Sequence, residues 1–337
     1  MVNPHDLVEK WQKLKSSGVR LRDAAQELGT SEAKLLECAL GQSVLRLNPD
    51  FDAILTQMSE VGPVKAISRN DACVIECIGP YLGFKRVHGP IAILNNLEID
   101  LRVFMNHWAH AYAVKGESGF ESCQFFDKAG HAIHKIYATP GSNNEAFDRL
   151  CEGFAAGDQD LKHFEPEDVE PHQAPTPTSR EELLDAWSML EDTHDFNLML
   201  RKQKIGRVEA IELAQGEYTE RVSSSCIRDT LNWASQGAHK LMFFVGNKGA
   251  IQIYSGGIQK VVDARGWLNV LDPSFNLHLK EDLIAKSFLV RKPTKDGDVN
   301  SIEVFDERGE LIVQCFGVRK PGQQESEAWR SHVSSLV

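Results

Sequence analysis

The sequence has no long hydrophobic run. Nowhere in its 337 residues do we find about 18 consecutive apolar residues, the length that a membrane-spanning helix needs. The first residues, MVNPHDLVEKWQKL, lack the apolar segment of a signal peptide. These absences predict a protein with no membrane-spanning helix and no export signal.

Cysteine is sparse, and its spacing suggests no pairing. The seven cysteines are odd in number, and none of them forms a CxxC motif. The sequence therefore gives no sign of a disulfide framework or of the zinc and redox motifs built on CxxC. Because no export signal is present, we expect reduced thiols and a cytoplasmic location.

Positive charge is in deficit. The chain has 37 Lys and Arg against 48 Asp and Glu, which gives a formal net charge of −11. This argues against a large contact surface for nucleic acid or for an anionic membrane. The segment LRDAAQELGTSEAKLLECAL resembles a helix-turn-helix, but its second helix offers one lysine against two glutamates. A nucleic-acid partner is therefore not expected.

Familiar catalytic motifs are missing as well. The sequence contains no GxGxxG, Walker loop, GxSxG or HExxH. Hydrophobic residues still make up 42% of the chain, so a sizeable core is expected and wholesale disorder is not.

The most informative positive feature is an internal duplication. FFDKAG in the first half corresponds to VFDERG in the second, HKIYAT corresponds to VQCFGV, and Trp11 corresponds to Trp187. The repeat is roughly 175 residues long, far above the periods of solenoid proteins. We predict a first repeat at 1–162 and a second at 180–337. The segment 163–179 between them is rich in proline and acidic residues and is predicted to be an extended linker.

Each repeat shows the same order of local patterns. A helical cluster comes first, then short β-rich runs, then a closing helix such as EAFDRLCEGF. In the second repeat the β-rich runs are broken by GNKG and SGG, which suits an antiparallel meander. The predicted fold class is therefore α+β, with a tandem duplication of the domain.

A histidine lies where a helix of the second repeat is expected to begin. Ser179 and Glu182 have capping-box spacing, so one helix should start there and end near EDT. A second helix should follow, with His194 in its first turn and Thr193 as a possible N-cap. The positive end of the helix dipole disfavours a protonated imidazole, and a neutral imidazole can bind a metal. A surface histidine without a function is the alternative interpretation.

Differences between the repeats favour the functional interpretation. A residue needed only for the fold should tend to occur in both repeats, yet His194 aligns with Gly18. Arg102 aligns with His278, so a cation also differs between the repeats.

The other histidines are weaker candidates for metal binding. His107 and His110 have i, i+3 spacing but no counterpart in the second repeat. His131 and His134 are expected in a strand, where this spacing points them to opposite faces. His88 precedes a glycine turn and is a candidate secondary ligand or a plain loop residue.

Taken together, several stretches resemble one family. They are THDFNLMLRK, IDLRVFMNHWA, MFFVGNKGAIQIYSG, GWLNVLDPSFNLHL, RKPTKDG and QCFGVRK. Over essentially the whole chain the sequence resembles the HemS/ChuS/PhuS family of bacterial cytoplasmic heme-handling proteins, also called hemin-degrading factors. The resemblance implies a duplicated α+β fold with large antiparallel sheets flanked by helices. It also implies heme in a cleft between the halves, ligated by His194, with Arg102 reaching its other face.

The resemblance implies further contacts with heme. The apolar walls would be Phe244 and Phe316, the propionate or cleft-edge contacts Arg207, Lys292 and Arg319, and a polar neighbour Gln314. Phe316 departs from the tyrosine of many relatives, so a hydroxyl contact would be lost or replaced. The resemblance implies heme b as the ligand, and the absence of a CxxCH motif excludes its covalent attachment.

Two functions remain open at this point. One is a heme carrier that receives imported heme, possible partners being a heme ABC importer and a downstream heme oxygenase. The other is an enzyme that degrades heme with O₂ and an electron donor, in which Arg102 would be the catalytic residue. Both need the same pocket, so the sequence does not separate them.

Overall fold

The computed structural model describes residues 4–162, 164–165, 178–319 and 322–337. Most of the predicted linker, 163–179, therefore lies outside the described residues. The chain divides into two compact units. Unit 1 comprises Met1–Arg69, Glu76–Val169 and Asn247–Gln252, and unit 2 comprises Asn70–Ile75, Glu170–Gly246 and Ile253–Val337.

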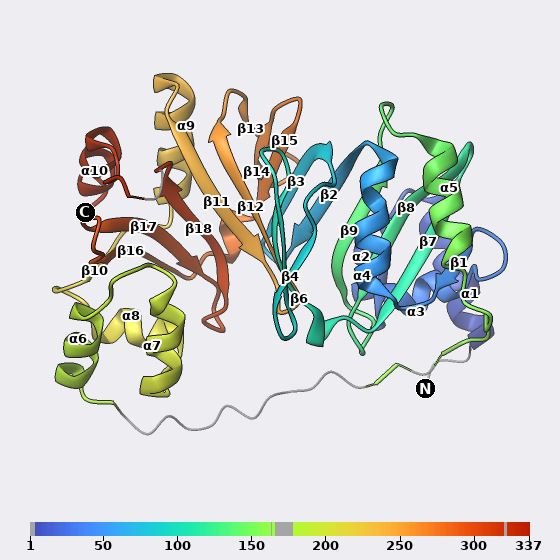
Figure 1. Cartoon of the computed structure of the whole chain (residues 1–337), viewed down its shortest axis with the longest axis horizontal. Coiled ribbons are helices and arrows are strands. Elements are labelled where there is room, and N and C mark those ends of the chain that lie inside the picture. Colours follow the sequence, from blue (N-terminus) through green and yellow to red (C-terminus); the bar gives the residue numbers. More distant parts are fainter. Residues whose placement is uncertain (1–3, 163, 166–177, 320–321) are drawn as a thin grey trace. The chain divides into compact units, whose positions relative to one another are not determined.

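Unit 1 combines short helices with strands (Figure 1). Its helices are α1 (Pro4–Ser16), α2 (Leu21–Glu27), α3 (Glu32–Glu37), α4 (Phe51–Gln57), α5 (Asn144–Gly153) and the 3₁₀ helices η1 (Met58–Val61) and η2 (Met105–His107). Its strands are β1 (Val44–Leu47), β2 (Pro63–Arg69), β4 (Lys85–His88), β5 (Ile91–Asn95), β6 (Asp100–Phe104), β7 (His110–Gly116), β8 (Gly119–Phe126) and β9 (Ala132–Ala138).

Unit 2 repeats this plan. Its helices are α6 (Arg180–Ser188), α7 (Asp195–Gln203), α8 (Arg207–Leu213), α9 (Cys226–Gly237), α10 (Glu327–Ser334) and the 3₁₀ helix η3 (Glu281–Leu283). Its strands are β10 (Thr219–Arg221), β11 (Lys240–Gly246), β13 (Val261–Ala264), β14 (Trp267–Leu271), β15 (Phe275–Leu279), β16 (Lys286–Lys292), β17 (Val299–Phe305) and β18 (Leu311–Gly317). The unit boundaries pass through β3 (Cys73–Pro80) and β12 (Ala250–Gly257).

The sheet order shows the duplication. Within the described residues the strands form two nine-stranded sheets, β1-β7-β8-β9-β2-β3-β15-β14-β13 and β10-β16-β17-β18-β11-β12-β6-β5-β4. The first five strands of one order correspond one by one to the first five of the other. Pairs such as β7–β8 and β16–β17 are antiparallel. The predicted α+β class with large antiparallel sheets flanked by helices is thus confirmed.

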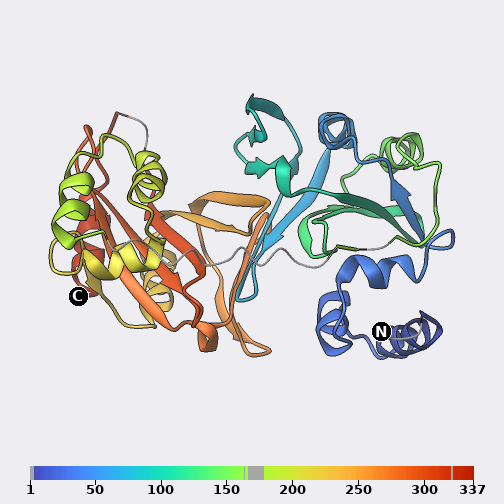
Figure 2. The same cartoon turned by 90° about the horizontal axis from the view of Figure 1, so that it is seen from below.

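The core of unit 2 explains where its first three helices lie. Trp187 of α6 is fully buried, stacks on Tyr218 at 5.4 Å between ring centroids, and meets Phe196 of α7 edge-on at 4.7 Å. These rings pack with Phe288 of β16 and Phe305 of β17 in one cluster. Figures 1 and 2 both show α6, α7 and α8 grouped beside these strands.

Two turns are exchanged between the repeats in the two compact units. Asn247, from the second repeat, belongs to unit 1, where its Nδ2 donates to the carbonyls of Arg69 and Ile133, both at 2.9 Å. Asn70, from the first repeat, belongs to unit 2, where its Nδ2 donates to the carbonyls of Gly246 at 3.2 Å and Ile312 at 2.8 Å. Each repeat therefore contributes a turn to the unit formed mainly by the other.

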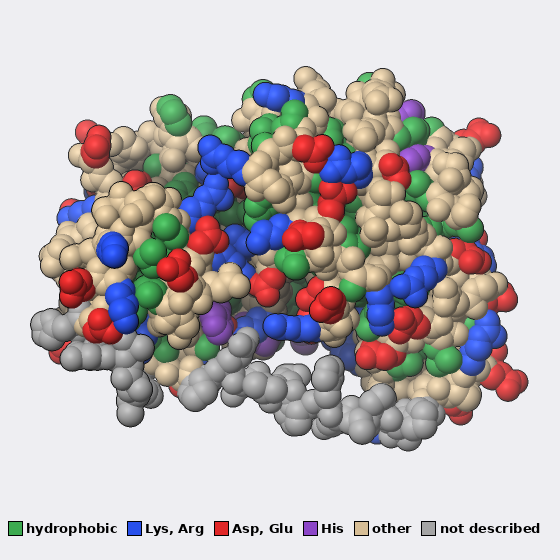
Figure 3. All heavy atoms as spheres, turned by 180° about the vertical axis from the view of Figure 1, so that it is seen from behind, with side chains coloured by type: hydrophobic (Ala, Val, Ile, Leu, Met, Phe, Trp, Pro, Cys, Tyr) green, Lys and Arg blue, Asp and Glu red, His purple; other side chains and the backbone are tan. Residues whose placement is uncertain are grey.

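Two further features concern membrane crossing and the helix-turn-helix-like segment. No helix of the described residues is both long and apolar enough to cross a membrane. The second helix of the helix-turn-helix-like segment, α3, has its Glu32 and Glu37 buried in ion pairs with Lys135 and Arg46. Acidic side chains are spread over the face seen in Figure 3, so no broad surface there is purely basic.

Candidate functional site

His194 immediately precedes helix α7 and points into solvent. The capping box predicted from Ser179 and Glu182 starts α6, which ends at Ser188, and α7 begins at Asp195. The His194 side chain is 90% exposed. Its imidazole is therefore accessible to a ligand, as the metal-binding interpretation requires.

The N-cap residue of α7 is His194, whose side chain makes no capping hydrogen bond, so the predicted N-cap Thr193 is wrong. Asp192 Oδ1 accepts the backbone N–H of His194 at 2.9 Å, and Asp195 Oδ2 accepts the N–H of Asp192 at 3.0 Å. These two hydrogen bonds resemble a capping box, but they close the turn that precedes α7. Thr193 contributes only a 3.5 Å contact from its Oγ1 to the Asp192 carboxylate.

The same carboxylate also contacts the imidazole. Asp192 Oδ1 lies 2.5 Å from Nδ1 of His194. The backbone N–H of His194, followed by its side chain and by the charge of Arg319, lowers the pKa of Asp192 although partial burial opposes the shift. Asp192 is therefore a charged partner for the ring at neutral pH.

A buried charge cluster lies in the same unit. The Glu303 side chain is fully buried, with Oε2 2.6 Å from Nη1 of Arg207 and Oε1 2.7 Å from Nζ of Lys292. Burial raises the pKa of Glu303, but the charges of Arg207 and Lys292 outweigh it and hold this pKa at about 2. Two cations thus share one carboxylate, which leaves a net positive charge in the cluster.

Phe196 connects this cluster to the helix that follows His194. The guanidinium carbon of Arg207 lies 4.9 Å from the Phe196 ring centroid, and Nζ of Lys292 lies 4.8 Å from it. Nη2 of Arg207 also donates to Oδ1 of Asn197 at 3.1 Å. Cation–π contacts and a hydrogen bond therefore fix the first turn of α7 against α8 and β16.

A half-buried apolar face lies on strands β11 and β18. The rings of Phe244 and Phe316 meet edge-on, with centroids 5.2 Å apart, and Phe244 pairs with Gln314 in the strand register. All three side chains are half-buried, whereas Phe243 and Cys315, on the opposite face, are fully buried. Nζ of Lys292 lies 5.8 Å from the Phe316 ring, which connects this face to the charge cluster.

The two remaining predicted cations of unit 2 differ in their surroundings. Lys292 is only 3% exposed and is already bonded to Glu303, so its predicted contact with a propionate remains a prediction. Arg319 is half-buried, and its nearest carboxylate is that of Asp296, at 3.9 Å. Arg319 is therefore the less constrained of the two.

Arg102 and His88 belong to unit 1. Nη1 of Arg102, in β6, contacts the carboxylate of Asp100 and donates to the carbonyl of Leu101 at 3.1 Å. His88 is exposed at the end of β4. Their predicted contacts with the ligand of His194 remain predictions.

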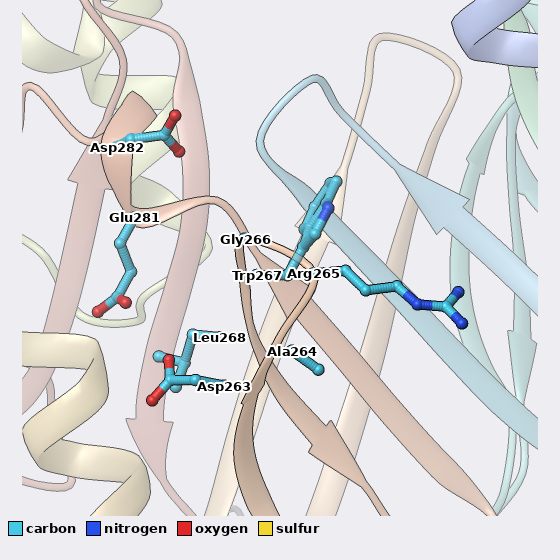
Figure 4. Close-up of a pocket in the computed structure, with 8 residues that line it drawn as sticks. All are labelled: Asp263, Ala264, Arg265, Gly266, Trp267, Leu268, Glu281 and Asp282. Atoms are coloured by element: carbon cyan, nitrogen blue, oxygen red, sulfur yellow. The ribbon is translucent and has the colours of Figure 1, made fainter.

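A cavity of 540 Å³ elsewhere in unit 2 contains none of the predicted site residues. It is lined by Asp263, Ala264, Arg265, Gly266, Trp267, Leu268, Glu281 and Asp282. Two of its carboxylates, Asp263 and Glu281, are paired with Arg228. Figure 4 shows the Arg265 side chain directed away from those two acids.

The described residues contain no group of three or more His, Cys, Asp or Glu that could hold a metal ion.

Comparison with known proteins shows the family. The model of the haemin-degrading HemS.ChuX domain matches the chain twice, at residues 29–154 and 204–336. The chain is 36% identical to the hemin transport protein HemS of Yersinia enterocolitica over 329 residues, which cover 96% of this chain and 94% of HemS.

Two solved structures have the same fold over the full chain. Holo-PhuS, a heme-binding protein from Pseudomonas aeruginosa, superposes with a TM-score of 0.91 at 36% identity and covers 100% of this chain and 99% of its own. The heme-degrading enzyme ChuS of Escherichia coli O157:H7 has a TM-score of 0.92 at 32% identity and covers 99% of this chain and 100% of its own. The chain belongs to the HemS/ChuS/PhuS family, and the predicted resemblance is confirmed.

Three residues of this region are not predicted from the sequence as site residues: Asp192, Phe196 and Glu303. Glu303 lies in β17 at the position that Gln124 occupies in β8, so a comparison of the repeats could have revealed it. Asp192 could have been found as an acid two residues before the candidate ligand.

Proposed function

We propose that this protein is a cytoplasmic heme-binding protein in which His194 is the axial ligand of non-covalent heme b. One observation carries the proposal. His194 is an exposed imidazole that an aspartate orients, in a unit that also holds a half-buried aromatic face and a net positive cluster. The seven cysteines are free thiols, which is consistent with a reducing compartment.

The side chains present fit the three needs of heme. The Nε2 atom of His194 would ligate the iron, and Phe244 and Phe316 would contact the apolar macrocycle. Arg319 would offer a cation to a propionate, because its only ion pair in the described residues is long, at 3.9 Å. Arg207 would contribute through its unshared donors, because Glu303 takes only part of its guanidinium.

The function is tested by titrating the full-length protein with hemin and recording the Soret band. We expect one tight site per chain, and His194→Ala should shift the band and weaken binding. His88→Ala is measured beside it, because His88, exposed at the end of β4, is the candidate secondary ligand. An unchanged spectrum and affinity in His194→Ala would rule out this residue as the ligand.

Heme degradation is the second candidate function. It is favoured because ChuS, which superposes over nearly the whole chain, is described as a heme-degrading enzyme. As an enzyme, the protein would receive heme from a membrane importer and accept electrons from a donor. As a carrier, it would pass the heme to a downstream oxygenase. Adding a reductant to the hemin complex separates the two, since degradation destroys the Soret band and leaves a biliverdin-like product.

A further inference from the structure

One carboxylate oxygen of Asp192 serves two groups of His194. Asp192 Oδ1 accepts the backbone N–H at 2.9 Å and lies 2.5 Å from the ring nitrogen Nδ1. The backbone N–H of Asp192 donates to Oδ2 of Asp195 at 3.0 Å, so hydrogen bonds hold both ends of this turn. Since the imidazole is 90% exposed, this contact gives an orientation to a ring that solvent would leave free to rotate.

We propose that Asp192 is a positioning residue that keeps His194 as the Nδ1–H tautomer and presents Nε2 as the iron-binding nitrogen. The inference rests on the function proposed above. An ionised carboxylate can only accept hydrogen bonds, so the 2.5 Å contact requires the ring proton on Nδ1. The lone pair is then on Nε2. Histidines that bind metals almost always have such a partner on the other nitrogen.

The duplication supports a role for Asp192 beyond closing the turn before α7. In the alignment that matches Trp11 with Trp187, Ser16 stands opposite Asp192 and Gly18 stands opposite His194. In the first repeat Ser16 Oγ donates to the carbonyl of Lys13 at 2.8 Å, and no ring lies at the position of His194. The carboxylate and the imidazole therefore occur together, and only in the second repeat.

The charge of Asp192 has an electronic consequence. A hydrogen bond from Nδ1–H to a carboxylate increases electron donation by Nε2. Stronger donation stabilises ferric iron more than ferrous iron. Asp192 therefore favours retention of oxidised heme, and its removal should raise the reduction midpoint of the bound heme.

The test uses three full-length proteins: wild type, Asp192→Ser and Asp195→Asn. Asp192→Ser installs the residue of the first repeat, whose hydroxyl can still accept the backbone N–H of His194 but is too short to reach the ring. Asp195→Asn is the matched control, because it removes a charge beside His194 and keeps an acceptor for the N–H of Asp192. Folding is checked by circular dichroism and thermal unfolding.

Two measurements decide the outcome. Nitrogen-15 NMR of the heme-free protein should show His194 as the Nδ1–H tautomer in wild type and Asp195→Asn, but not in Asp192→Ser. In hemin titrations Asp192→Ser should lose about tenfold to hundredfold in affinity, as other partners of metal-binding histidines do, and its reduction midpoint should rise.

Wild-type affinity and midpoint in Asp192→Ser would overturn the role of Asp192, and so would an Nε2–H tautomer in the wild type. The His194→Ala titration separates this failure from that of the proposed function. If His194→Ala binds hemin as the wild type does, the ligand assignment fails and the role of Asp192 fails with it. If His194→Ala loses affinity but Asp192→Ser binds hemin as the wild type does, His194 remains the assigned ligand and only the role of Asp192 fails.

Discussion

Glu303 Oε2 lies 2.6 Å from Nη1 of Arg207, and none of the Glu303 side chain is exposed. Lys292 takes the other carboxylate oxygen at 2.7 Å. The contact joins β17 to α8 and β16, beside the helix that follows His194. A carboxylate buried this deeply is tolerated because it is paired and hydrogen-bonded.

Glu303→Gln should destabilise unit 2. The amide is nearly isosteric and matches Gln124 of the first repeat, but it leaves the charge of Lys292 buried without a counterion. Breaking a buried ion pair in this way costs about 3–5 kcal/mol in the free energy of unfolding. Urea unfolding followed by tryptophan fluorescence measures the loss, and Glu307→Gln, at an exposed position, is the control.

The pH dependence gives a second check on Glu303. Its pKa is lowered to about 2 in the folded protein, so its stabilisation is present above the unfolded value of about 4.3 and is lost as the pH falls toward 2. The difference between wild type and Glu303→Gln should therefore shrink over this range. Equal stability of the two proteins at pH 7 would contradict the account.

Unit 1 should lose stability at milder acidity because of His134. Its ring is 1% exposed, and Nδ1 lies 2.9 Å from Ser68 Oγ. Burial lowers the pKa of His134 to about 3. Below the unfolded pKa of about 6.5, His134 binds a proton in the unfolded chain but stays neutral in the folded chain. The free energy of unfolding therefore decreases by about 1.4 kcal/mol for each pH unit of acidification, down to about pH 3.

The check is unfolding of wild type and His134→Gln between pH 7 and pH 4. The variant lacks the titrating group, so its stability should depend less on pH in this range. Proton NMR of His134 should show a neutral ring at pH 5. A charged ring at that pH would contradict the prediction.

Local patterns in the sequence predicted the architecture well. The two repeats, the antiparallel strands and the capping box of Ser179 and Glu182 all follow from short-range spacing, which secondary structure obeys. The position of His194 at a helix start was also correct. Thr193 was predicted as the N-cap because its hydroxyl suits that role, yet His194 takes this position and the carboxylates of Asp192 and Asp195 bond the turn before it.

The buried cluster could not be predicted in the same way. Lys292 and Glu303 are on different strands, and Arg207 is on a helix nearly a hundred positions away in the chain, so no local pattern brings them together. The exchanged turns have the same origin. Asn70 and Asn247 occur at matching positions of the repeats, but only the fold shows that each turn belongs to the unit formed mainly by the other repeat.

Asn247→Ala should weaken unit 1. The variant removes the Nδ2 donor to the carbonyls of Arg69 and Ile133 and the Oδ1 acceptor for the N–H groups of Gly249 and Ala250. With about 1 kcal/mol for each net hydrogen bond, we expect a loss of about 2–4 kcal/mol in unfolding free energy. Thermal and urea unfolding measure it.

Asn247→Asp keeps the Oδ1 acceptor but puts a carboxylate oxygen in place of the Nδ2 donor, facing the carbonyls of Arg69 and Ile133. It should therefore lose stability as well, because an ionised carboxylate cannot donate a hydrogen bond and is repelled by carbonyl oxygens. A fragment of residues 180–337 lacks the turn that holds Asn70, so it should unfold at lower urea than the same region in the full chain. Equal midpoints would show that the exchanged turn contributes nothing to unit 2.

Arg102 should affect the fate of bound heme more than its retention. Arg102→Ala removes one charge-assisted donor, worth about 1.5–3 kcal/mol. Because 1.4 kcal/mol is about tenfold, hemin affinity should fall by no more than one to two orders of magnitude. The ligand bond from His194 and the apolar contacts would still hold the heme, so the Soret band should persist in the titration.

In the degradation assay the same donor would stabilise charge that develops on oxygen during the reaction. Preorganised donors of this kind commonly change rates by about 10²–10³, so Arg102→Ala should lose most reductant-driven degradation while it still binds heme. Arg86→Ala is the control, because Arg86 is another arginine of unit 1 and is paired with Asp52 at 2.8 Å. If the wild type degrades no heme with any reductant in the presence of catalase, the enzymatic function fails and only the carrier function remains. An Arg102→Ala protein that degrades heme at the wild-type rate would remove the role of Arg102 but not the enzymatic function.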